Sequence, residues 1–157
     1  MARAREVEID CEASFAAAAV RVVGTRTEEV FEQASGVLDL DDVERVHDMR
    51  VAIRRLRAAL EVFEPCFPSK RWRKALKRVK VLADALGGRR DLDVEIELLE
   101  GLSGEIAEDD RFAVTALIED LRTGQRRAND DLAPFVKAKS LKKLRRRLEK
   151  LVAAAGT

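Results

Sequence analysis

The sequence predicts an all-α protein, an antiparallel bundle of about six helices that forms a single domain over residues 1–157. Charged residues make up 38% and hydrophobic residues 46%, mostly strong helix formers, and only 8 Gly and 3 Pro interrupt them. Apolar residues recur at intervals of three and four, and no segment alternates strictly between apolar and polar residues as a half-buried strand does. Short connections make successive helices antiparallel neighbours.

The first predicted helix spans about residues 7–34, with Gly24 as a candidate bend. Its core candidates are Phe15, Ala18, Val22, Val30 and Phe31. The second helix shows the clearest pattern, because Asp41 or Asp42 offers an N-cap and Pro65 ends the helix. Six apolar positions form one stripe along it: Val46, Met49, Ile53, Leu56, Leu60 and Phe63.

The third helix is predicted to start at Ser69 and to stop at Gly87 and Gly88. A short fourth helix follows, capped by Asp91 and ending at Leu102. The core candidates of these two helices are Trp72, Leu76, Val79, Ala83, Leu86, Leu92, Ile96 and Leu99.

A loop at Ser103 and Gly104 leads to a fifth predicted helix over residues 109–128. A sixth predicted helix follows over residues 130–154. Their core candidates are Ala113, Leu117, Leu121, Leu141, Leu144, Leu148 and Leu151.

Cysteine usage and hydropathy point to the cytoplasm. Cys11 and Cys66 lie far apart and form no CxxC motif, so the sequence predicts neither a disulfide framework nor a zinc site. The longest apolar run, residues 15–20, is too short to span a membrane. An acidic beginning argues against a signal peptide.

The net charge of +1 conceals a strong segregation of charge. Residues 45–90 hold 14 basic and four acidic residues, a local charge of +10. Residues 135–151 hold eight basic residues and one acidic residue, a local charge of +7, so the rest of the chain sums to −16. A basic pole of this size attracts anionic partners.

On the second helix a basic row follows the apolar stripe by one residue: His47, Arg50, Arg54 and Arg57. This offset places the row about 100° around the helix from the stripe, and the row spans roughly 15 Å. The third helix repeats the offset with Arg73, Lys77 and Lys80. Equal offsets on antiparallel helices make the two rows either converge on one seam or diverge symmetrically.

Each of these features also has a purely structural interpretation. Basic rows are commonly solvated helix faces, although the clustered charges here destabilise the helix and favour an external anion. His47, the only histidine, fits a half-buried structural residue or a hydrogen-bond donor to phosphate. Asp91 and Asp93 fit paired carboxylates for a metal or for acid–base chemistry, but a helix cap and an ion pair near Arg90 explain this region better.

Two segments resemble the CHAD family, the histidine α-helical domains. The first is VHDMRVAIRRLRAAL over residues 46–60, which contains His47 and Arg50 and is continued to Phe63. The second contains KVLA, LG and RDLDV between residues 80 and 94. Both stand in the order and separation of the family's signatures, and the resemblance covers roughly residues 8–155. Members usually contain two pseudo-symmetric helical repeats, of which this sequence resembles the first.

The resemblance implies non-catalytic binding of inorganic polyphosphate, with no cofactor and no metal. It assigns His47, Arg50, Arg54 and Lys80 to the anion surface, with Arg57 beside them, while Arg90 and Asp91 match the pattern and also suit a role in fixing a turn. The helical pattern adds Arg73, Lys77 and, from the basic last helix, Lys143. Two chains are expected to pair so that they rebuild the two-repeat domain.

CHAD domains often accompany triphosphate tunnel enzymes, which are β-barrels with an ExExK motif. Here Glu95 and Glu97 are followed by Leu99 where the lysine belongs, and no strands are predicted around them, so we expect no enzymatic activity. The rival hypotheses are a nucleic-acid-binding bundle, a scaffold for an acidic protein and a phosphohydrolase. The basic sixth helix could bind nucleic acid, but it lacks the aromatic interleaving typical of single-strand binders. We expect a cytoplasmic protein, with polyphosphate granules as a candidate site of association.

Overall fold

The computed structural model describes residues 3–102, 104 and 106–156, and these residues form an all-α bundle without strands. The α-helices in this part of the chain are α1 (Phe15–Glu32), α2 (Val43–Val62), α3 (Ser69–Leu102), α4 (Arg111–Val136) and α5 (Ala138–Val152). Short 3₁₀ helices lie at Glu64–Cys66 and Glu108–Asp110. The predicted fold class is confirmed.

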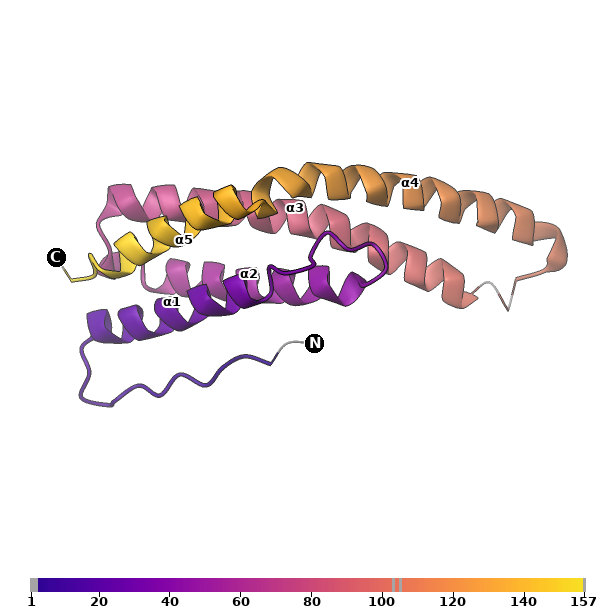
Figure 1. Cartoon of the computed structure of the whole chain (residues 1–157). Helices are drawn as coiled ribbons and strands as arrows, with labels where there is room; N and C mark the ends of the chain where they lie inside the picture. The colour runs from indigo at the N-terminus through magenta and orange to yellow at the C-terminus, as the bar shows by residue number, and fades with distance from the viewer. Residues whose placement is uncertain (1–2, 103, 105, 157) are drawn as a thin grey trace.

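Helices α3 and α4 form one long antiparallel hairpin (Figure 1). α2 and α5 pack against α3, and α1 packs against α2 and α5. The main hydrophobic core lies where α1, α2, α3 and α5 meet. The far end of the α3/α4 hairpin extends beyond α1 and α2 (Figure 1). The molecule therefore has a thick end with a shared core and a thin end with only two helices.

The apolar stripe of α2 is buried as the sequence predicts. Val46, Met49, Ile53, Leu56 and Leu60 are 0% exposed, and Phe63 is 8% exposed. Each such side chain stabilises the fold by about 1.5–3 kcal/mol relative to an exposed one. This burial fixes the rotation of α2 about its axis, and with it the flank on which the neighbouring basic residues lie.

The predicted stop at Gly87 and Gly88 is wrong, because α3 continues through both glycines to Leu102. Leu86 and Arg89 on either side are fully buried, so tertiary packing holds this turn helical. A glycine within a helix costs about 1 kcal/mol relative to alanine, which is less than the packing supplies. Asp91 is an exposed residue within α3 and no cap, and the predicted third and fourth helices are one element.

The boundary between the last two helices also lies elsewhere than predicted. α4 continues through residues 128–130 and ends at Val136. The next residue, Lys137, has an extended backbone with φ −58° and ψ 143°, which interrupts the helix. The Ser140 hydroxyl donates a hydrogen bond of 2.7 Å to the carbonyl of Pro134 across this break. Pro134 lacks the N–H of a regular helical residue and is tolerated near the end of α4.

α1 begins at Phe15 and not near residue 7, because Ser14 caps it. The Ser14 hydroxyl accepts a hydrogen bond of 3.2 Å from the backbone N–H of Ala17. Phe15, a core candidate, is 55% exposed, although its ring lies 4.9 Å from that of Phe63 between centroids. The predicted loop residue Ser103 lies outside the described residues.

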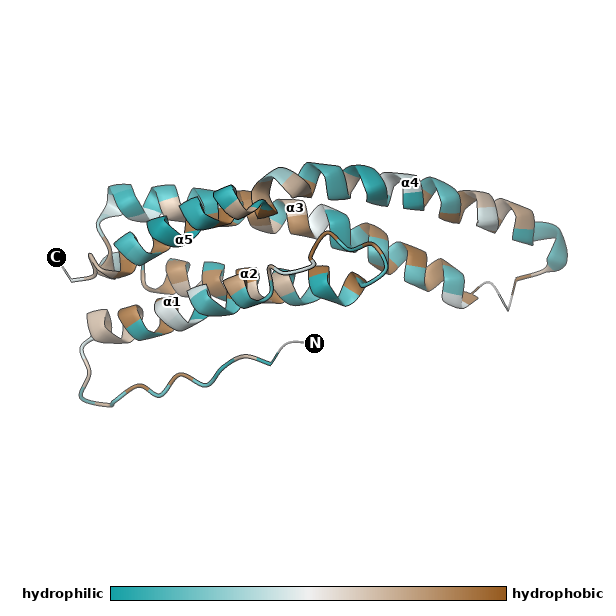
Figure 2. Cartoon of the chain, viewed as in Figure 1, coloured by the Kyte–Doolittle hydropathy of each residue, from teal (hydrophilic) through white to brown (hydrophobic). Residues whose placement is uncertain are grey.

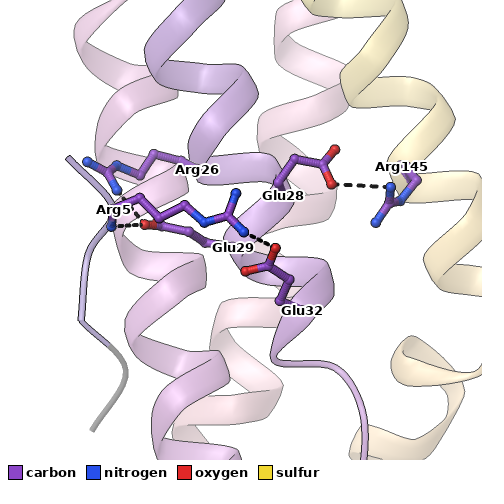
Figure 3. A network of polar contacts seen from close by, with 6 residues as sticks. All are labelled: Arg5, Arg26, Glu28, Glu29, Glu32 and Arg145. Atoms are coloured by element: carbon purple, nitrogen blue, oxygen red, sulfur yellow. Dashed lines mark hydrogen bonds and ion pairs between the residues drawn. The ribbon is translucent and has the colours of Figure 1, made fainter. Parts of the chain in front are cut away.

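The segment before α1 is held against the bundle by ion pairs (Figure 3). The Glu29 carboxylate accepts hydrogen bonds of 2.6 Å from the Arg5 backbone N–H and from the Arg26 side chain. The Arg5 side chain also pairs with Glu32. These contacts tie the extended N-terminal segment to α1.

The thin end of the hairpin explains two further departures from the predicted core. Ala113 and Leu117 are exposed, Leu117 by 48%, because the first half of α4 extends past α1 and α2. Figure 2 shows brown apolar residues in this projecting part, interspersed with teal polar ones. Among the described residues, no helix combines the length and the hydropathy that a membrane crossing requires.

Candidate functional site

The basic row of α2 lies beside the buried stripe. His47 and Arg50 are half-buried and Arg54 is exposed, and all three lie along one flank of α2. The Nε atom of Arg50 lies 4.0 Å from the point where a side chain at Gly87 of α3 would begin. The α2 row therefore borders α3.

Glu61 shows that the rows of α2 and α3 converge. Its Oε1 atom lies 3.0 Å from Nε of Arg57 on α2 and 3.5 Å from Nζ of Lys80 on α3. Two cations from different helices thus meet at a single carboxylate. We call the surface formed by the rows of both helices the α2/α3 seam: His47, Arg50, Arg54, Arg57, Arg73, Lys77 and Lys80.

The electrostatics of the seam are strongly positive despite Glu61. The hydrogen bond from Arg57 lowers the pKa of the Glu61 carboxyl, and the charge of Lys80 lowers it further. Glu61 is therefore ionised at neutral pH and offsets one charge. The remaining cations have no ion pair within the part of the chain that the structure describes: Arg50, Arg54, Arg73 and Lys77.

The other predicted site residues lie in different places. The Arg90 side chain is mostly shielded from solvent, with 12% of it exposed, and its Nη1 atom lies 3.5 Å from Oε1 of Glu97. Lys77, a member of the seam, also borders a hollow on the outer face of α3 together with Arg147 of α5. Lys143 lies on α5 and faces α3. The structure thus brings Arg50, Arg57 and Lys80 to the seam and leaves Lys143 outside it.

Asp93 belongs to a buried network that joins α3 to α4. Its Oδ2 atom accepts a hydrogen bond from Arg89, and its Oδ1 atom accepts one of 2.7 Å from Gln125. Burial raises the pKa of the Asp93 carboxyl and lowers that of the Arg89 guanidinium. The Nε and Nη2 atoms of Arg89 have no partner among the described residues, so Asp93 is its one counterion there.

This network changes the interpretation of the acidic residues near Arg90. Asp91 is exposed while Asp93 is fully buried, so the two do not form a paired carboxylate site. Among the described residues, no group of three or more His, Cys, Asp or Glu side chains is placed to hold a metal ion.

Sequence reasoning missed a second concentration of positive charge, which lies between α3 and α5. A groove of about 810 Å³ separates the two helices. We call it the α3/α5 groove, and its lining residues are Arg71, Lys74, Arg78, Lys143, Arg146, Arg147, Lys150 and Ala153. The local charge of +7 over residues 135–151 pointed to α5 but not to its partner on α3.

Comparison with protein families matches residues 21–157 to the CHAD domain, which is most of the chain. The CHAD domain is known as a polyphosphate-binding domain. The chain matches no curated protein and no solved structure.

We expect Asp93→Ala to lower the free energy of unfolding by about 3–5 kcal/mol, because it leaves the fully buried Arg89 charge without its counterion. Urea denaturation followed by circular dichroism measures the change. Asp91→Ala is the control, since this exposed residue should change stability by no more than about 0.5 kcal/mol. Equal denaturation midpoints for the two variants would show that the buried pair contributes nothing.

Proposed function

The chain belongs to the CHAD domain family, and on this basis we propose that it binds inorganic polyphosphate through the α2/α3 seam, without catalysing a reaction. The observation that carries the proposal is the meeting of Arg57 and Lys80 at Glu61, because it brings the basic rows of two helices to one surface. Guanidinium groups bind phosphate oxygens through paired, charge-assisted hydrogen bonds.

The dimensions of the seam suit an extended polyanion. From His47 to Arg57 the α2 row covers roughly 15 Å at a rise of about 1.5 Å per residue. Lys80 and Arg73 continue the positive charge on the neighbouring helix. An extended chain of phosphates can therefore contact several cations in succession.

The aromatic residues favour polyphosphate over a single-stranded nucleic acid. Trp72 is half-buried, and its ring N–H donates a hydrogen bond of 2.7 Å to the carbonyl of Leu60. Phe63 is buried, and the exposed Phe112 lies at the start of α4, in the projecting hairpin. Neither Trp72 nor Phe63 thus presents a fully exposed ring to a base, whereas a polymer of phosphates needs no aromatic platform.

A non-catalytic role is part of the proposal. Glu61 is engaged by Arg57 and Lys80, and Asp93 by Arg89 and Gln125, so neither carboxylate is held ready as a general base. Association with an acidic protein stays an alternative. The expected cytoplasmic location and the association with polyphosphate granules stay predictions.

We expect Arg50→Glu with Arg54→Glu to weaken polyphosphate binding by at least about 100-fold, because two charge-assisted contacts become repulsive. Isothermal titration calorimetry at two salt concentrations measures the affinity, which should fall steeply with salt in the unchanged protein. The matched control is Arg111→Glu with Arg126→Glu, two exposed residues on α4.

Circular dichroism checks that both double variants keep their helicity. Unchanged affinity in the α2 variant would remove the seam from the proposal. Duplex or single-stranded DNA that competes equally with polyphosphate at equal charge would favour the nucleic-acid alternative.

Glu61→Gln should strengthen polyphosphate binding about two- to fivefold, since the seam loses a competing carboxylate and the charges of Arg57 and Lys80 become available. The same titration detects the gain. Glu95→Gln, an equal change of charge at an exposed position in the second half of α3, serves as control and should leave the affinity within twofold. Weaker binding by the Glu61 variant would mean that Glu61 positions its cations for the ligand.

We also propose that two chains associate through the projecting part of the α3/α4 hairpin. Leu98 near the end of α3 is 61% exposed, and Phe112 near the start of α4 is 85% exposed. These two helix ends form the projecting part of the hairpin (Figure 1). Sedimentation velocity should show a dimer, and Phe112→Ser should weaken it about tenfold or more, because the contact loses one buried aromatic side chain. Sedimentation as a monomer at all concentrations would exclude this association.

A further inference from the structure

The seven cations of the α3/α5 groove lack counterions. All seven side chains are exposed, and none of them has an ion pair within the described residues. Arg145, another arginine of α5, differs from the groove cations because it has an ion pair. Arg145 faces α1, where its Nη1 atom lies 3.4 Å from Oε2 of Glu28 (Figure 3). Its guanidinium also lies 4.4 Å from the centre of the Phe31 ring.

Burial of the apolar stripes aims these cations into the groove. On α5, Leu144, Leu148 and Leu151 are buried, and each follows a lining cation by one residue. On α3, the lining residues Lys74 and Arg78 likewise precede buried residues. The groove cations thus lie on the flank of α3 opposite to the seam row, whose members follow the stripe.

Like charges are crowded along both walls of the groove. Lys143 and Arg147 are four residues apart on α5, and Lys74 and Arg78 are four residues apart on α3, so each pair lies on one helix face. Such pairs destabilise a helix unless an anion lies between them. Residues 69–83 of α3 contain no acid at all, and no acidic residue lines the groove. Among the described residues, no acidic side chain that lines the groove offsets these charges.

The groove and the seam are joined across the outer face of α3. A hollow of about 300 Å³ is bordered there by Lys77 of the seam and by Lys74, Arg78 and Arg147 of the groove. Arg78 and Arg147 line this hollow as well as the groove. Positive charge is therefore continuous from one flank of α3 to the other.

We propose that the α3/α5 groove binds a second stretch of the same polyphosphate chain that the seam holds, so that one polymer crosses the outer face of α3. This inference rests on the proposed function. Half the circumference of a helix about 10–12 Å in diameter is roughly 17 Å, which sets the arc that a chain must cover. Shorter phosphates occupy the seam or the groove separately, whereas a longer chain occupies both.

A length dependence follows from this arrangement. Once one stretch of a long chain is bound, the next stretch is present at a high effective concentration at the second surface. The affinity for long chains should then exceed that for a short phosphate by about 10²–10⁴-fold, with no contact of a new kind.

Isothermal titration calorimetry with inorganic tripolyphosphate and with long-chain polyphosphate tests the proposal. The groove variant is Arg78→Glu with Arg147→Glu, the seam variant is Arg50→Glu with Arg54→Glu, and the control is Arg111→Glu with Arg126→Glu. The unchanged protein and the control should bind two tripolyphosphate ions, and each of the other variants should bind one. The groove variant should still bind tripolyphosphate at the seam. The ratio of its affinity for long-chain polyphosphate to its affinity for tripolyphosphate should fall at least about tenfold.

The outcomes separate this inference from the proposed function. If the groove variant keeps the full affinity for long chains while the seam variant loses it, the groove is no binding surface and the proposed function stands. If the seam variant keeps its affinity and the groove variant loses it, one chain does not join the two surfaces and the seam proposal fails. If the unchanged protein binds neither probe, both proposals fail.

Folding of the variants is checked by circular dichroism. Should the groove variant lose helicity, Lys74→Gln with Lys150→Gln removes two groove charges without reversing them and takes its place in the same titrations. Binding of long-chain polyphosphate at unchanged affinity by this milder, folded variant would overturn the inference.

Discussion

The packing of α3 against its neighbours is the constraint on which the distribution of charge depends. Its apolar residues, among them Val79 and Leu86, are fully buried in the core shared with α1, α2 and α5. Because this stripe cannot rotate away from the core, Lys80, which follows it, lies beside Glu61 of α2, whereas Lys74 and Arg78, which precede it, line the groove with α5. A single buried stripe thus sorts the cations of one helix onto two flanks. The positive surface on either side is a consequence of apolar packing and not of ion pairing.

The sequence was informative where a local pattern and the tertiary structure agree. The stripe of α2 from Val46 to Phe63 is both periodic and buried, so its position and the flank of its basic row could be predicted. At Gly87 and Gly88 the two disagree, because local propensity favours a stop while the buried Leu86 and Arg89 hold the helix. Each glycine lowers the stability of a helix by about 1 kcal/mol relative to alanine. The burial of one large apolar side chain contributes more than this, so the helix continues.

The candidate site could be predicted only in part, since an offset along one helix gives a flank but not the neighbour on that flank. Convergence of the two rows became visible only through Glu61, which touches cations from α2 and α3. The groove was missed for a related reason. Arg71, Lys74 and Arg78 precede the stripe of α3 and become a surface only when α5, more than sixty residues later in the chain, packs beside them. Lys143 was named from its charge and lies in the groove, away from Glu61 and the other seam contacts.

The seam and the groove differ in one respect that bears on how a polyanion uses them. At the seam, Glu61 already lies between Arg57 and Lys80, so a phosphate there competes with an internal carboxylate whose pKa these cations lower. No acidic residue lines the groove, so an anion bound there would face no internal competitor and would reduce the repulsion among the lysines and arginines. Each cation of the protein that neutralises a phosphate releases a counterion condensed on the polyanion, and the seven groove cations have no internal carboxylate that competes for them. The steepest dependence on salt should arise at the groove, while Glu61 moderates the attraction at the seam.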